Sequence, residues 1–114
     1  MLFEKKYNWV RIADSVKNIP GLEQGIGEIL HEGRTICLVY WNQQLYAFSG
    51  NCPHAGAPLS KGELDPRGII LCPRHGYSFN IRNGQNTSGE GFMLSCWPVE
   101  ERQDGVFIGL RQSM

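Results

Sequence analysis

The chain has 114 residues, of which 41% are hydrophobic and 19% charged, and its 11 basic residues balance its 11 acidic residues. This length favours a single globular domain with one core. The composition is not that of a disordered chain, and no basic stripe marks a nucleic-acid-binding surface, so we expect no nucleic-acid partner.

The longest apolar run, at 36–41, is far too short to span a bilayer, so we expect no membrane partner. The first residues, MLFEKKYNWV, lack the apolar segment of a secretory signal. Two of the 4 cysteines lie beside histidines rather than in a disulfide framework. Together these features predict a cytoplasmic protein with free or metal-bound thiols.

Short runs with alternating or continuous apolar residues, separated by turn residues, predict a succession of strands. In chain order these runs lie at about 7–12, 25–33, 34–41, 44–50, 68–72, 77–81, 93–101 and 105–111. Only 14–17 could form a single helical turn, and 82–91 is expected to be a loop. The pattern therefore predicts an all-β protein, either a sandwich or a barrel.

Hairpin turns are expected where turn residues join consecutive runs. Glu32-Gly33 joins the second and third runs, Asn42-Gln43 joins the third and fourth, and 103–105 joins the last two. Strands joined by such short turns pair in the antiparallel direction.

The chemistry is concentrated in two short segments, Cys52-Pro53-His54 and Cys72-Pro73-Arg74-His75. Each follows a predicted strand, so both loops could meet at one end of a sheet. Thiolate and imidazole are ligands for zinc, copper or iron–sulfur centres. Three interpretations compete: a structural zinc site, a [2Fe-2S] cluster, and a nucleophilic Cys/His pair.

The spacing of the first segment favours the cluster. Cys52 and His54 are separated by one residue, whereas zinc sites separate paired ligands by two or more. In a [2Fe-2S] centre one iron can take two cysteines and the other two histidines, so each loop supplies one ligand to each iron. A nucleophilic pair would leave one cysteine and one histidine unexplained.

These segments resemble the Rieske family motif C-x-H…C-x-x-H. The resemblance continues through 57–62 (APLSKG), 79–84 (FNIRNG), 97–99 (WPV) and 104–106 (DGV). It implies one domain over 1–114, built as an antiparallel β-sandwich or barrel base (1–46 and 83–114). A small two-loop cluster-binding subdomain would occupy about 47–82.

The resemblance also implies the site. Cys52 and Cys72 would hold one iron of the [2Fe-2S] cluster, and His54 and His75 the other. The residues expected to surround these ligands are Pro53, Ala55, Gly56, Pro73, Arg74, Gly76, Tyr77 and Ser78.

High-potential members carry a disulfide between the loops, at the positions of Ala57 and Arg74 in this chain, and hydroxyl donors at the positions of Tyr77 and Phe79. This chain lacks the disulfide, and Phe79 has no hydroxyl, so a low reduction potential is expected. The sequence leaves open whether Tyr77 or Ser78 supplies a hydroxyl instead. The third loop, 88–93, lacks the proline common in the family, and Phe92 or Met93 is expected to cover the cluster instead.

The function implied by the resemblance is electron transfer without bond chemistry. Only His31 remains as a further histidine, too few for the mononuclear iron of an oxygenase. No dinucleotide fingerprint is present, so electrons would come from an upstream flavoprotein or ferredoxin reductase and pass to an oxygenase or similar redox enzyme. Two alternatives stay open: a small subunit of a nitrite reductase-like enzyme, and a zinc-stabilised binding module without a redox role.

Overall fold

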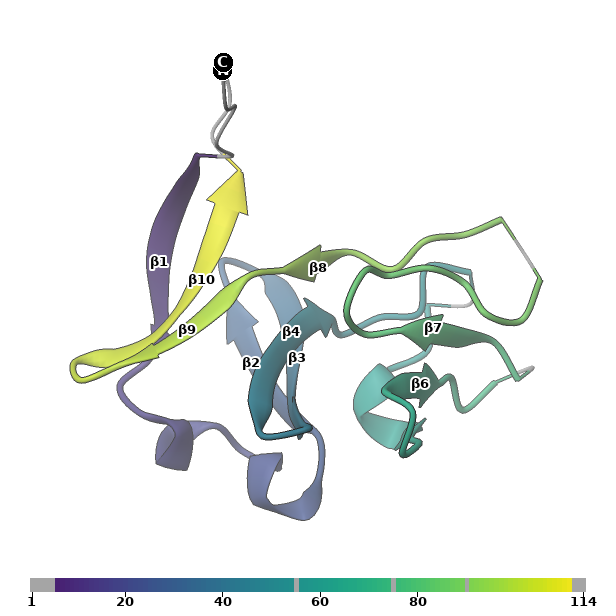
Figure 1. Ribbon diagram of the computed structural model, residues 1–114, viewed down its shortest axis with the longest axis horizontal. Coiled ribbons are helices and arrows are strands. Elements are labelled where there is room, and N and C mark those ends of the chain that lie inside the picture. Colours follow the sequence, from purple (N-terminus) through teal and green to yellow (C-terminus); the bar gives the residue numbers. More distant parts are fainter. Residues whose placement is uncertain (1–5, 55, 75, 90, 112–114) are drawn as a thin grey trace.

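A computed structural model describes residues 6–54, 56–74, 76–89 and 91–111 (Figure 1). Within these ranges the chain forms ten strands and three single-turn 3₁₀ helices. The strands are β1 (Tyr7–Ala13), β2 (Gly27–His31), β3 (Arg34–Trp41), β4 (Gln44–Ser49), β5 (Glu63–Leu64), β6 (Ile69–Leu71), β7 (Ser78–Asn80), β8 (Cys96–Trp97), β9 (Val99–Arg102) and β10 (Gly105–Arg111). The helices are η1 (Val16–Asn18), η2 (Leu22–Gln24) and η3 (Leu59–Lys61).

The strands form three antiparallel sheets, with the orders β1-β10-β9, β2-β3-β4-β8 and β5-β6-β7. The predicted all-β class is therefore confirmed. No helix in the described part of the chain is long and apolar enough to cross a membrane.

The two predicted hairpin turns flanking β3 are present. Glu32 and Gly33 both have positive φ (50° and 76°), as do Asn42 and Gln43 (55° and 67°). Positive φ at both central residues is typical of the type I′ turn, whose twist matches that of paired strands. These turns fix the register of β2, β3 and β4, with His31 opposite Arg34 and Trp41 opposite Gln44.

Three details differ from the sequence-based expectations. The run at 93–101 forms two strands, β8 and β9, in different sheets, because Pro98 interrupts it. The helical turn expected at 14–17 lies slightly later, as η1, where the Ser15 hydroxyl accepts a hydrogen bond from the Lys17 N–H at 3.1 Å. The two-residue strand β5 was not predicted.

Strand β3 lies between two hydrophobic cores. Ile36 and Leu38 face the core shared with β10, whereas Cys37 and Val39 face the core that contains the two cluster loops. Successive side chains of a strand point to opposite faces, and here both faces are covered. Because both faces of β3 are buried, residues 36–39 are all apolar.

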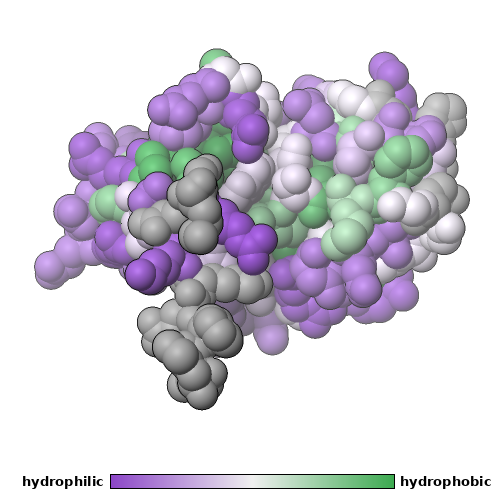
Figure 2. All heavy atoms as spheres, turned by 90° about the horizontal axis from the view of Figure 1, so that it is seen from above, coloured by the Kyte–Doolittle hydropathy of each residue, from purple (hydrophilic) through white to green (hydrophobic). Residues whose placement is uncertain are grey.

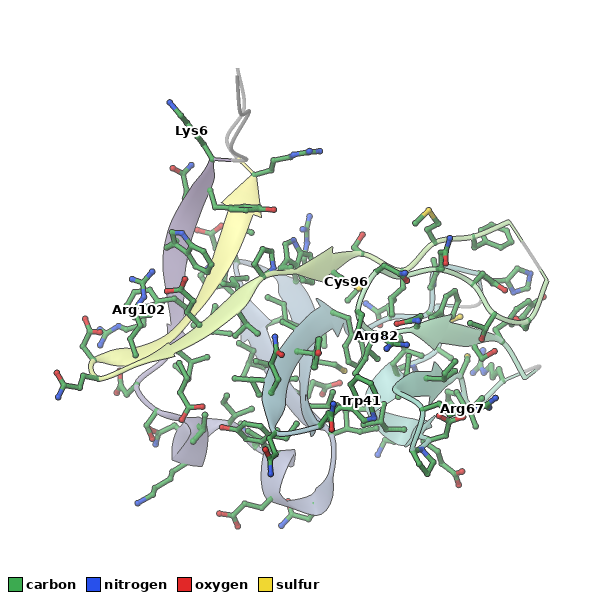
Figure 3. The ribbon with its side chains drawn as sticks, viewed as in Figure 1. Lys6, Trp41, Arg67, Arg82, Cys96 and Arg102 are labelled. Carbon is green, nitrogen blue, oxygen red and sulfur yellow. The ribbon has the colours of Figure 1, made fainter. Side chains whose placement is uncertain are left out.

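The sheet β5-β6-β7 lies on the opposite side of the molecule from β1 and β10 (Figure 1). Trp41, at the end of β3, connects the two regions, since its indole Nε1 donates a hydrogen bond to the Pro66 carbonyl at 2.9 Å. Figure 3 shows Trp41 between the middle sheet, β2-β3-β4-β8, and the smaller sheet β5-β6-β7. At the far end of the molecule, Tyr7 of β1 pairs with Arg111 of β10.

Candidate metal centre

The two Cys/His loops share one backbone design. The Cys52 N–H donates to the Ala57 carbonyl at 2.8 Å, and the Cys72 N–H donates to the Tyr77 carbonyl at 2.7 Å. In each loop the acceptor lies five residues after the cysteine.

The residue before each acceptor is a glycine with positive φ, 68° at Gly56 and 69° at Gly76. These glycines allow each loop to turn back on its cysteine, because side chains other than glycine rarely adopt this conformation. The chain has thus formed the same loop twice, once after β4 and once after β6.

The two cysteines lie together in the interior. Cys52 is 2% exposed and Cys72 is 6% exposed, and both belong to the core cluster that packs against β3 and β4. Burial raises the pKa of the Cys72 thiol, and the adjacent Cys52 thiol raises it further. The Arg74 N–H, 3.4 Å from Cys72 Sγ, opposes this by favouring the thiolate.

His54 is exposed at the tip of the first loop. Its Nε2 lies 2.9 Å from the hydroxyl oxygen of Tyr77, which belongs to the second loop. The ring centroids of His54 and Tyr77 are 4.0 Å apart. On another side, the Phe92 ring meets His54 edge-on with a centroid distance of 5.0 Å. The one described histidine of the motif is therefore in contact with both other loops.

His75, the fourth predicted ligand, and Ala55 lie outside the described residues. Of the other residues predicted to surround the ligands, Tyr77 is half-buried and Ser78 is buried. The exposed ones are Pro53, Gly56, Pro73, Arg74 and Gly76. The Ser78 hydroxyl is 2.6 Å from the Thr87 hydroxyl, so it binds the third loop.

The third loop, 88–93, and the residues beside it are held by several hydrogen bonds to β7 and to the turn that follows β7. The Ser78 N–H donates to Ser88 Oγ at 3.2 Å, and the Thr87 N–H donates to the Ser78 carbonyl at 2.9 Å. Farther along, the buried residue Leu94 donates its N–H to the Gly84 carbonyl at 2.8 Å. Phe92 lies between these attachments, which explains how an exposed aromatic ring is held against His54.

The donor set fits a [2Fe-2S] group bound by thiolates and imidazoles. Two thiols lie side by side in the interior, and one imidazole lies exposed at the tip of the first loop. Thiolates and imidazoles are the ligands of a histidine-ligated iron pair. No three His, Cys, Asp or Glu side chains among the described residues surround a position for one metal ion.

Sequence reasoning missed two features of the centre. The first is the repeated loop, although the spacing Cys-Pro-x-x-Gly occurs at both 52–56 and 72–76 and could have revealed it. The second is the Tyr77 hydroxyl on His54, which no pattern in the sequence indicates. All four cysteines are free; Cys37 is buried, whereas Cys96 is half-buried.

The family model "Rieske [2Fe-2S] domain" matches residues 8–97. The ferredoxin component of the alkene monooxygenase system of Xanthobacter autotrophicus is 28% identical over 74 residues, covering 65% of this chain and 61% of that protein. Human apoptosis-inducing factor 3 is 44% identical over 88 residues, covering 76% of this chain but only 13% of that protein.

Other relatives match over most of both chains. Ferredoxin CarAc of Metapseudomonas resinovorans is 29% identical over 102 residues, covering 88% of this chain and 92% of that protein. Among solved structures, a complex of reduced oxygenase and oxidized ferredoxin in carbazole 1,9a-dioxygenase contains a chain with 27% identity and a TM-score of 0.73. That alignment covers 93% of this chain and 96% of that one.

Proposed function

This chain belongs to the Rieske [2Fe-2S] domain family, and we propose that it is a ferredoxin that carries single electrons between two larger redox proteins. The observation that carries the proposal is the paired loops, which bury two thiols together and keep His54 at the surface. When bound, a [2Fe-2S] cluster accepts and returns one electron.

The proposed ligands are Cys52 and Cys72 on the inner iron and His54 and His75 on the outer one. Burial of the two cysteines keeps water away from the thiolates, and the Arg74 N–H beside Cys72 Sγ stabilises negative charge there. The surface position of His54 gives an electron a short path to a docked partner.

We propose that partners dock at the cluster end of the molecule. The exposed His54 edge lies beside Phe92, which is 45% exposed, and Phe92 is followed by Met93, which is 61% exposed. Figure 2 shows apolar and neutral surface, green and white, on the side of the molecule where the cluster loops lie. A small surface of this kind suits the brief contacts of electron shuttling.

The proposed partners are an upstream flavoprotein or ferredoxin reductase and a downstream oxygenase. Support comes from the ferredoxin CarAc, which matches over most of its length, and from the carbazole dioxygenase complex, in which a ferredoxin is bound to an oxygenase. The cytoplasm is the proposed location, and the four free thiols are compatible with a reducing compartment.

Metal and sulfide analysis of freshly purified protein tests the proposal. We expect two iron and two acid-labile sulfide per chain, a visible spectrum, and a reduced-state EPR signal of a histidine-ligated cluster. Cys72→Ala should abolish the cluster, whereas Cys96→Ala, which removes a half-buried thiol outside the loops, should retain it. Colourless protein with stoichiometric zinc and no iron would show that the chain is the zinc-stabilised module instead.

A further inference from the structure

The His54 imidazole is held by aromatic rings from both other loops. The Tyr77 ring contacts it in a tilted geometry, with a centroid distance of 4.0 Å and an interplanar angle of 40°, and the Phe92 ring meets it edge-on at 5.0 Å and 67°. We propose that Tyr77 and Phe92 are positioning residues for His54, and that the Tyr77 hydroxyl holds the ring through Nε2. This inference rests on the proposed cluster.

The hydrogen bond with Tyr77 engages one of the two ring nitrogens of His54. His54 Nε2 lies 2.9 Å from the Tyr77 hydroxyl, so it is already engaged, and Nδ1 is the nitrogen left for a metal. With Nδ1 bound to iron, the ring proton sits on Nε2 and is donated to the Tyr77 oxygen. Metal-bound imidazoles generally donate their second nitrogen to a carboxylate, a carbonyl or water, which fixes the ring. In this chain a tyrosine hydroxyl takes that place.

Tyr77 can fix His54 because its own backbone is fixed. Its carbonyl accepts the Cys72 N–H at 2.7 Å, and its half-buried ring packs against the core of the cluster loops. Tyr77, which closes the second loop through its carbonyl, therefore also contacts His54, the proposed ligand in the first loop. One side chain thus ties the position of His54 to that of Cys72.

Phe92 completes the arrangement from the solvent side. An exposed imidazole can rotate about its side-chain bonds, and each added aromatic contact reduces the conformations available to it. The ring of Phe92 is itself 45% exposed, so it gains little from its own burial and covers His54 instead. Phe92 is one of the two residues that we expected to cover the cluster, and that role stays a prediction.

The test measures release of iron to a chelator from the oxidised protein. Tyr77→Phe keeps the ring and removes only the hydroxyl, and we expect iron release about tenfold faster, as is typical when the hydrogen-bond partner of a metal-bound histidine is lost. Phe92→Leu should accelerate release about threefold through loss of the ring contact. Leu30→Ala, which truncates a 73% exposed apolar side chain on β2, is the control and should match the wild type.

A second readout separates positioning from general stability. In Tyr77→Phe protein labelled with ¹⁵N-histidine, we expect a changed hyperfine coupling of one histidine nitrogen in pulsed EPR, with a thermal midpoint close to that of the wild type. Unchanged iron release and unchanged couplings in both Tyr77→Phe and Phe92→Leu would overturn the inference and leave the electron-carrier proposal intact. Absence of iron from the wild type would instead overturn the proposed function, and this inference with it.

Discussion

The guanidinium of Arg82 lies over the indole ring of Trp41, with its central carbon 4.8 Å from the ring centre (Figure 3). Trp41 ends β3 and Arg82 follows β7, so the contact joins the middle sheet to the sheet that carries the second cluster loop. The hydrogen bond from Trp41 Nε1 to the Pro66 carbonyl, at 2.9 Å, strengthens the same joint. Trp41 thus adds two contacts to the packing that holds the cluster loops on the middle sheet.

Trp41→Phe should weaken this joint. The loss of one hydrogen bond and part of a cation–π contact is expected to lower the free energy of unfolding by about 1–2 kcal/mol. Urea denaturation measures this change, and iron release should also become faster. Trp9→Phe is the matched control, because Trp9 contacts Arg102 at 5.3 Å in the base sheet. Equal acceleration of iron release by both variants would contradict a specific role for Trp41.

The reduction potential should lie at the low end of the range for His-ligated clusters, nearer about −150 mV than +300 mV. Ala57 and Arg74 replace the cysteines of the loop disulfide, and Phe79 provides no hydroxyl. The Ser78 hydroxyl binds Thr87, and the Tyr77 hydroxyl lies at His54 Nε2. Redox titration followed by EPR measures the midpoint, and a strongly positive value would contradict this prediction.

Gly84→Ala should detach the third loop. Gly84 has a φ of 79°, and a Cβ added there would collide with the Leu94 carbonyl oxygen. We expect destabilisation of about 1–3 kcal/mol, typical of strain at such a position, and faster iron release because Phe92 loses its anchor. Gly89→Ala is the control, since it has a similar φ of 95° but no atom near the added Cβ. If Gly89→Ala accelerates iron release as much, backbone strain alone accounts for the effect.

The protein should lose stability in alkaline solution through its buried thiols. Burial, aided by Glu28, raises the pKa of Cys37 from 9.0 to about 12. Above pH 9 the unfolded state therefore binds fewer protons than the folded state, and stability falls as the pH rises towards 12. The slope should approach about 1 kcal/mol per pH unit.

Cys37→Ala should remove this part of the slope between pH 9 and 12, whatever it does to stability at neutral pH. Cys96→Ala should reduce the pH dependence of stability only between pH 9 and 11, because the pKa of Cys96 is raised from 9.0 to about 11. Thermal unfolding across this pH range measures both effects. Parallel curves for the wild type and Cys37→Ala would contradict the assignment to this thiol.

Local patterns were sufficient to predict much of the fold. The turns at Glu32-Gly33 and Asn42-Gln43 were predictable because two-residue hairpins have strong residue preferences. The strand β5 and the helices η2 and η3 were not, because two or three residues show no periodicity. The division of 93–101 into two strands depends on which sheet each half joins, and a single segment does not carry that information.

In the candidate site, too, local sequence patterns predicted some features and not the contacts between separate loops. The positions of Cys52, His54 and Cys72 on loops after strands follow from the spacing of the motif. The contacts of His54 with Tyr77 and Phe92 arise from the packing of three separate loops, so they became visible only in three dimensions. The ligand roles of Cys52, His54, Cys72 and His75 stay predictions.

The pairing of Tyr7 with Arg111 has a consequence for how this unit can be built into larger proteins. Both ends of the described chain leave the molecule at the same edge, on the side away from the cluster loops (Figure 1). A tether or further domain attached at either end would leave the proposed docking surface at His54 and Phe92 accessible. In human apoptosis-inducing factor 3, the segment similar to this chain makes up only 13% of the protein, so there the similar segment lies within a much longer polypeptide.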